Sequence, residues 1–351
     1  MSEVTVLMTV YNGRPYLPLA IKSILNQTFS DFEFLIVNDC STDDTRDVIL
    51  SYDDPRIRLL DNDENIGQTR SLNRGLACAQ GELVARMDAD DISHPKRLEM
   101  QVAYLHAHPS IVAIGTNLRF IDHTGRVIRQ YMRPKHDLAL RWMQLFECPI
   151  SCGAVTFRKS IIWDILGGFD PSISISQDWE LWSRVLPEYK IANLPDLLLD
   201  VRKHVACVTA VARDAAIEEQ RRICRSNPHR ILGIAEDSEE WLRKVEMIMP
   251  WPNDHPDLRL EVVEVLYDRF CALYPIALED QDILRELSRQ YLRAAEESRF
   301  NNLLTAFKAW QLAWPRSSKS FYLWRFTRWL AILVGARQVK SRILKIIGKT
   351  T

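Results

Sequence analysis

The chain has 351 residues, of which 47% are apolar and 26% are charged, and its formal net charge is −1. This composition is that of a globular protein long enough for two domains, and it excludes an intrinsically disordered chain. Residues 315–351 hold nine Lys or Arg and no acidic residue, which leaves 36 basic against 46 acidic side chains in the rest of the chain. This acidic remainder argues against nucleic acid as its partner, whereas the basic segment suits an anionic surface.

The first 100 residues alternate short apolar runs with stretches of helical periodicity. We expect strands at residues 4–10, 32–37, 57–60 and 83–87, because each run is short, apolar and rich in β-branched residues. We expect helices at residues 17–25, 41–52 and 65–80, and a further helix that starts near Pro95. This alternation predicts an α/β fold with a mostly parallel, twisted sheet flanked by helices.

The pattern changes after residue 110. A hairpin is expected around residues 122–125, a strand at 153–157, and helices at 161–166 and 178–186. Residues 190–203 are expected to be extended, as two short strands. From 211 to 310 the chain has long charged amphipathic stretches and almost no glycine, which predicts an all-helical C-terminal extension.

The last segment, residues 315–351, is rich in basic and aromatic residues. In a helix its apolar and basic residues would lie on opposite faces, which is typical of a helix at a membrane surface. The alternative is that its apolar stripe packs on the helices of 211–310. With no signal peptide, no run of 18 apolar residues and no CxxC pair, we expect a cytoplasmic protein, with peripheral contact to the inner, anionic face of the plasma membrane.

Polar side chains follow three of the predicted strands. They are Thr9, Tyr11 and Asn12, then Asn38 and Asp39, then Asp88, Asp90 and Asp91. Because ligands bind at the carboxyl ends of parallel strands, we expect these side chains to gather at one site. Asp88 and Asp90 provide the hard oxygen ligands that Mg²⁺ and Mn²⁺ prefer. The alternative is a solvated acidic turn, with Asp91 best suited to cap the next helix.

Three further side chains are candidates with equally simple alternatives. Asp178 starts a predicted helix, whose N-terminus stabilises a carboxylate; this suits a general base and also an ordinary cap. His204 ends the extended segment and could bind a metal or lie on the surface. Asp39 could accept an N–H group from a base such as uracil, or could simply form a turn.

Six stretches in fixed order make the sequence resemble a known family: residues 4–17, 23–45, 65–75, 85–91, 167–184 and 201–204. Together they resemble glycosyltransferase family 2, whose members have the GT-A fold and are inverting enzymes that use nucleotide sugars. The resemblance covers about residues 1–205. We therefore expect a GT-A catalytic domain at 1–207, a helical region at 208–314 and a basic aromatic amphipathic tail at 315–351.

The resemblance implies roles for individual residues. Positions that bind the nucleotide sugar are matched by Thr9, Tyr11, Asp39, Arg70, Asn73 and Asp88. Positions that bind Mn²⁺ or Mg²⁺ are matched by Asp90 and His204, and the catalytic base is matched by Asp178. The sequence departs from the family pattern in four places: Cys40 replaces a usual glycine, and Gln177 replaces a common glutamate. A valine precedes Arg202 where the family often has tyrosine, and residues 205–207 lack the usual polar loop residues.

The implied activity is transfer of a sugar, with UDP as the expected carrier, to a hydroxyl of a glycan or lipid-linked acceptor in bacterial surface polysaccharide synthesis. A sugar-nucleotidyltransferase is the first alternative, although the glycine-rich phosphate loop typical of those enzymes is absent from the first strand. The second is a module that binds nucleotide sugars without turnover. Release of UDP from a UDP-sugar separates the enzyme from the binding module.

Overall fold

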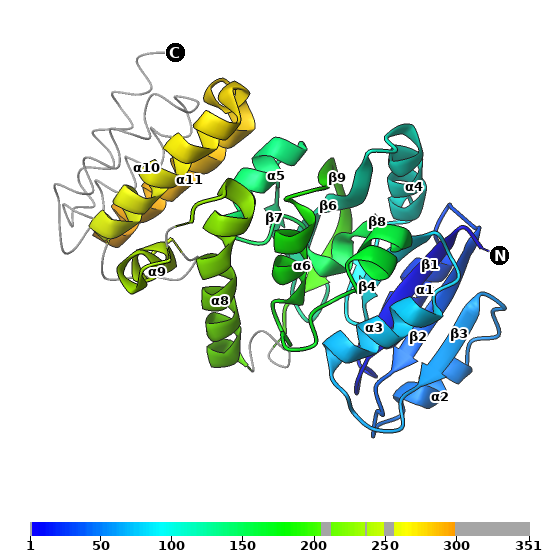
Figure 1. The fold of residues 1–351 in the computed structure, drawn as a ribbon. Helices are drawn as coiled ribbons and strands as arrows, with labels where there is room; N and C mark the ends of the chain where they lie inside the picture. Colours follow the sequence, from blue (N-terminus) through cyan, green and yellow to red (C-terminus); the bar gives the residue numbers. More distant parts are fainter. Residues whose placement is uncertain (1, 205–211, 236, 249–255, 299–351) are drawn as a thin grey trace, which may run out of the picture. The chain divides into compact units, whose positions relative to one another are not determined.

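The computed structural model describes residues 2–204, 212–235, 237–248 and 256–298. The chain forms two compact units, Met1–Ile231 and Leu232–Thr351 (Figure 1). Helix α8, Arg213–Leu232, therefore lies almost entirely in the first unit, together with the sheet. The tail expected at 315–351 lies outside the described residues.

Four parallel strands form the N-terminal part of the sheet. They are β1 (Val4–Val10), β2 (Phe32–Asn38), β3 (Ile57–Asp61) and β4 (Leu83–Asp88), in the order β3-β2-β1-β4. Every residue of β1 and β2 is buried, as expected for parallel strands covered on both faces. All four lie where the apolar runs predict strands.

Helices connect these strands. They are α1 (Leu17–Leu25), α2 (Thr45–Leu50), α3 (Gln68–Cys78) and α4 (Arg97–Ala107). Helix α3 packs on β1 and β2 and starts close to where those strands end (Figure 1). The first residues of α3 are therefore near the carboxyl ends of the strands, where a ligand is expected.

The rest of the sheet is mixed. It contains β5 (Ile92–Ser93), β6 (Ile111–Ile121), β7 (Val127–Tyr131), β8 (Thr156–Arg158) and β9 (Lys190–Arg202). Strand β8 runs antiparallel to both β4 and β6, β9 runs parallel to β6, and β6 and β7 form the expected hairpin. Strand β5 pairs with β9, which returns the end of β9 to the acidic turn after β4.

Three predicted elements differ in detail. Residues 190–203 do not form two short strands: β9 is one strand of 13 residues. Its pairing with β6 continues along its length, with shifts of register around Asn117 of β6. The strand expected from Gly153 begins only at Thr156, because η1 (Cys152–Ala154) is a 3₁₀ turn. The helix expected at 161–166 is a π-helix, η2 (Ser160–Ile165).

Two further helices complete the first unit, α5 (Asp137–Gln144) and α6 (Gln177–Val185). The second unit has α9 (Glu239–Glu246), α10 (Pro256–Leu273), the 3₁₀ turn η3 (Pro275–Leu278) and α11 (Gln281–Ser298). Its described elements are all helical, as predicted, and Val263, Phe270, Ile283 and Leu287 are buried where α10 and α11 pack. Within the described residues, no helix is long and apolar enough to cross a membrane.

Candidate functional site

The carboxyl ends of β1, β2 and β4 bring the predicted polar residues to one edge of the sheet. Thr9 is in register with Asp88 on one side and with Val37 on the other, and Asp39 follows β2 directly. The hydroxyl of Thr9 is buried and has no hydrogen-bond partner among the described residues. Buried hydroxyls are normally satisfied, so Thr9 has bonding capacity left for a ligand at this edge.

Asp39 holds the loop that leads into α3. Its side chain is nearly fully buried; Oδ1 accepts hydrogen bonds from Asn62 Nδ2 (2.6 Å) and Ile66 N (2.9 Å), and Oδ2 accepts one from Gly67 N (2.9 Å). Because a carboxylate oxygen can accept two hydrogen bonds, Oδ2 keeps capacity for a ligand. The neighbouring Cys40 has a φ of 59°, in the left-handed region that favours the glycine usual in the family.

Three other residues predicted to bind the nucleotide sugar differ in their exposure and contacts. Tyr11 is 50% exposed in the loop after β1, and Arg70 is exposed on α3. Asn73, by contrast, donates from Nδ2 to the carbonyl of Phe169 (2.7 Å) and accepts from the N–H of Phe169 (2.8 Å). Both ends of the Asn73 amide therefore anchor the loop that precedes α6.

The acidic turn after β4 lies against two buried arginines. Arg86 is 1% exposed and forms an ion pair with Asp88. Arg97, fully buried, donates to the carbonyls of Arg86 (2.6 Å) and Gly153 (3.0 Å), and burial lowers its pKa to about 10. These two guanidinium groups compensate carboxylates that would otherwise be costly to bury.

Asp91 does not cap the next helix, which corrects the alternative that the sequence suggested for this residue. It is buried, and its Oδ1 accepts a hydrogen bond from the N–H of Arg202 (2.9 Å), whereas α4 begins only at Arg97. Asp91 therefore joins the acidic turn to the end of β9. This contact could not be predicted from the sequence, since 111 positions separate the two residues.

The same strand end places His204 beside Asp90. The distance from His204 Nε2 to Asp90 Oδ2 is 3.0 Å. The ring of Tyr16 lies 4.9 Å from the imidazole ring, and the guanidinium group of Arg202 lies 4.6 Å from the Tyr16 ring centre. Arg202 also donates from Nε to the carbonyl of Asp90 (3.0 Å). Tyr16 and Arg202 thus orient His204, a role that motif matching did not predict.

The charges of the turn suit a bound cation. Burial raises the pKa of Asp90, and the charge of Asp88 raises it further; burial and both neighbouring carboxylates raise the pKa of Asp91 well above its usual range. No three ligating side chains converge on one point within the described ranges. Mg²⁺ in phosphate-binding sites usually takes only one or two protein ligands, with phosphate oxygens and water completing the set, so Asp90 and His204 fit such an ion.

Asp178 is the second residue of α6 and is partly buried. Its Oδ2 accepts a hydrogen bond from Cys152 N (3.0 Å), and its Oδ1 accepts one from Trp179 N (2.8 Å). Burial raises the pKa of Asp178, and these two hydrogen bonds and the thiol of Cys148 offset part of the rise. A carboxylate with a raised pKa is a stronger base than an ordinary aspartate.

Asp178 and the acidic turn approach the same two-residue segment. Cys152 donates to Asp178, and a methyl group on the adjacent Gly153 would lie 2.6 Å from Asp88 Oδ2. A second connection runs through two glutamines: Gln177 Nε2 donates to Gln68 Oε1 (3.1 Å), and Gln68 Nε2 lies 3.4 Å from Asp88 Oδ1. The predicted base and the predicted donor-binding carboxylate therefore belong to one site.

Similar proteins support the family that the sequence motifs suggest. The family model for glycosyl transferase family 2 matches residues 5–166. A protein of Haemophilus influenzae, described as an uncharacterized glycosyltransferase, is 32% identical over 234 residues, which are 64% of this chain and 72% of the relative. The O-antigen biosynthesis glycosyltransferase WbnJ of Escherichia coli is 31% identical over 214 residues, which are 58% of this chain and 81% of the relative.

A solved structure supports the fold. The crystal structure of S. aureus TarS residues 1–349 in complex with UDP-GlcNAc has a TM-score of 0.57 at 17% identity, and the match covers 90% of this chain and 87% of that chain. The mixed sheet with flanking helices is therefore the GT-A fold expected from the sequence. Taken with the relatives above 30% identity, the fold and the acidic turn establish that this chain is a glycosyltransferase and belongs to glycosyltransferase family 2.

Proposed function

We propose that the chain transfers a sugar from a UDP-sugar to a hydroxyl of a glycan or lipid-linked acceptor, with inversion at the anomeric carbon, in the synthesis of bacterial surface polysaccharide. The observation that carries the proposal is the position of Asp178 and Asp88 against the adjacent residues Cys152 and Gly153. UDP-GlcNAc in the complex of TarS and the O-antigen role of WbnJ support the donor and the process.

The nucleoside end of the donor is assigned to Thr9, Tyr11 and Asp39. The unsatisfied hydroxyl of Thr9 and the remaining acceptor capacity of Asp39 Oδ2 support this assignment. A carboxylate can accept the N3–H group of uracil. We expect calorimetry to show tighter binding of UDP than of GDP or ADP, with the preference lost in Asp39→Ala. Thymine has the same hydrogen-bonding edge, so dTDP is the rival ligand, and preference for a purine nucleotide would contradict the assignment.

The diphosphate end is assigned to the acidic turn. Asp90 and His204 would hold Mn²⁺ or Mg²⁺, and Asp88 would face the ribose side. The ion, when bound, neutralises diphosphate charge as a Lewis acid. Arg86 and Arg97 would help to hold this turn, since buried Arg86 pairs with Asp88 and buried Arg97 donates to the carbonyl of Arg86.

Asp178 is assigned the chemical step. Its carboxylate accepts the proton of the acceptor hydroxyl while that oxygen forms a bond to the anomeric carbon. The bond from this carbon to the diphosphate oxygen breaks on the opposite face of the sugar, and the electron pair leaves with UDP. One displacement inverts the anomeric configuration, so the site needs no protein nucleophile.

The experiment is a turnover assay with purified protein, Mn²⁺ and a panel of UDP-sugars, with release of UDP as the signal. We expect release from at least one donor, stimulated by an acceptor glycan. Binding of UDP-sugars without any release would instead support the binding module. The product's anomeric configuration, measured by NMR, tests inversion separately.

Membrane contact through residues 315–351 is a further part of the proposal that rests on sequence alone. Each Lys or Arg near an anionic leaflet contributes about 1 kcal/mol, so nine could hold the protein at the surface. We expect the full chain to float with vesicles that contain anionic lipid, and a chain that ends at Ala313 to stay in the soluble fraction. Equal behaviour of the two chains would contradict membrane contact.

A further inference from the structure

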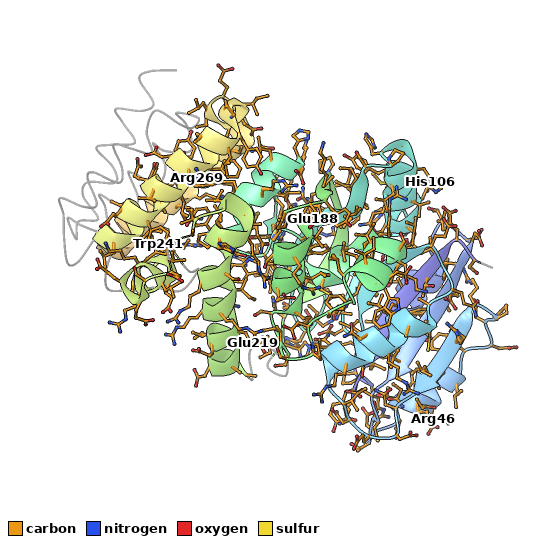
Figure 2. All side chains as sticks on the ribbon, viewed as in Figure 1. Arg46, His106, Glu188, Glu219, Trp241 and Arg269 are labelled. Carbon is orange, nitrogen blue, oxygen red and sulfur yellow. The ribbon has the colours of Figure 1, made fainter. Side chains whose placement is uncertain are left out.

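Two side chains of α8 bind the loop before Asp178: Arg222 contacts Ser172 and Asp170, and Glu219 binds the last three residues before α6. The carboxylate of Glu219 accepts hydrogen bonds from the N–H groups of Ser174 (2.7 Å), Ile175 (2.9 Å) and Ser176 (2.9 Å), and from the hydroxyl of Ser174 (2.7 Å). Figure 2 shows Glu219 near the first turn of α8. Three successive backbone donors on one carboxylate form an anion-binding nest, filled here by the protein's own side chain.

The same loop is held from the opposite side by α3. The hydroxyl of Thr69 donates to the carbonyl of Ile173 (2.7 Å), and Asn73 binds both backbone groups of Phe169. Helix α3 also provides Gln68, which lies close to Asp88. The loop from Phe169 to Ser176 is therefore fixed between a helix of the donor site and α8.

Helix α8 is itself fixed on α5 and α6. The amide of Asn227, fully buried, exchanges hydrogen bonds with Gln144, which also donates to the carbonyl of Trp179 (3.0 Å). Arg230 donates to the hydroxyl of Ser183 (2.6 Å). Trp179 and Ser183 lie on α6, the helix that carries Asp178, so Glu219 acts from a helix that is itself anchored to α6, directly and through α5.

The N-terminus of α6 depends on this support. Ser176 is the residue that caps α6, its own hydroxyl makes no capping hydrogen bond, and Asp178 follows two positions later. Hydrogen bonds to a charged acceptor are stronger than those between neutral groups. Without the carboxylate, the N–H group of the buried Ser176 would lose its partner, and the loop could move.

We propose that Glu219 is a positioning residue of the transfer reaction: it fixes residues 174–176 and thereby aims the carboxylate of Asp178 at the acceptor hydroxyl. This inference rests on the proposed role of Asp178 as the base. It extends the catalytic machinery to α8, well beyond residue 166, where the match to the family model ends.

The test compares Glu219→Gln with Glu218→Gln in the full chain. Glu218 is the matched control, because its side chain is 75% exposed and forms its ion pair with Arg221 of the same helix. We expect Glu219→Gln to lower kcat roughly 100-fold, the size of effect that a misplacement of about 1 Å produces. The Kd for UDP, measured by calorimetry, should stay unchanged. The melting temperature should fall by only about a few degrees, because a buried N–H group loses its partner while the rest of the fold is kept. Glu218→Gln should match wild type, and Glu219→Asp should recover part of kcat.

A double variant separates this inference from the proposed function. If Glu219 acts through Asp178, Glu219→Gln should have no further effect on kcat in the Asp178→Asn background. Losses of kcat that multiply in the double variant would overturn the positioning role, and so would a wild-type kcat in Glu219→Gln. Loss of UDP binding together with unfolding of Glu219→Gln at the assay temperature would also overturn it, because the lower kcat would then reflect a lost fold. Wild-type turnover in Asp178→Asn would instead overturn the proposed base.

Discussion

The backbone N–H of Cys152 donates a hydrogen bond to Oδ2 of Asp178 over 3.0 Å. The next residue, Gly153, adjoins Asp88, so the proposed base and the proposed donor-binding carboxylate both contact one 3₁₀ turn. Burial raises the pKa of the Cys152 thiol to about 12, so it stays protonated and does not compete as a nucleophile. Changes in this turn should affect both halves of the reaction.

The first prediction concerns Gly153→Ala. The new methyl group would lie 2.6 Å from Asp88 Oδ2 and 3.3 Å from Asp91 Oδ2, so the acidic turn must shift. We expect kcat/KM for the donor to fall about 100-fold. Steady-state kinetics measure this loss, and the melting curve checks that the variant is folded. Unchanged kinetics would show that the spacing between this turn and Asp88 has no role in donor binding.

The second prediction concerns pH. Burial raises the pKa of Asp178 above the ordinary aspartate value of about 3.9. The base acts only when ionised, so activity should be full above this raised pKa and should fall as the pH drops through it. We expect the acid limb of the kcat profile, measured at saturating donor, to lie above the pH at which an ordinary aspartate titrates. An acid limb at or below the ordinary value would mean that another group controls it.

The third prediction concerns the metal. We expect turnover to be lost in EDTA and restored by Mn²⁺ or Mg²⁺. Asp90→Asn and His204→Ala should each raise the metal concentration for half-maximal activity by about tenfold or more. His136→Ala is the control, because His136 is exposed at the start of α5 and lies outside the site. Full activity in chelator would remove the ion from the mechanism.

Much of the fold could be predicted from local pattern. Strands β1 to β4 and the start of α6 follow from short apolar runs and from helical spacing, and these are the elements whose ends carry Thr9, Asp39, Asp88 and Asp178. The principle that parallel strands end at one edge was enough to bring the first three together. Strand β9 was predicted less well, because Pro195 interrupts its pattern while pairing with β6 keeps it continuous.

The supporting contacts could not be predicted, because they join distant parts of the chain. Asp91 meets Arg202, and Glu219 meets Ser174, across many intervening residues with no motif to connect them. Arg86 did leave a signal: a charged residue within an otherwise apolar strand must have a partner. Its proximity to Asp88, two positions later, identifies that partner in retrospect.

The measurement that tests the account most directly is the turnover of Asp178→Asn beside its binding of UDP. The amide keeps the size of the side chain but cannot take up the acceptor proton. We expect kcat to fall by about 10²–10⁴-fold while the Kd for UDP stays within about twofold of wild type. Asp164→Asn is the matched control, since Asp164 is exposed on η2, and it should retain wild-type kcat. Wild-type turnover in Asp178→Asn would contradict the assignment of the base and the mechanism built on it.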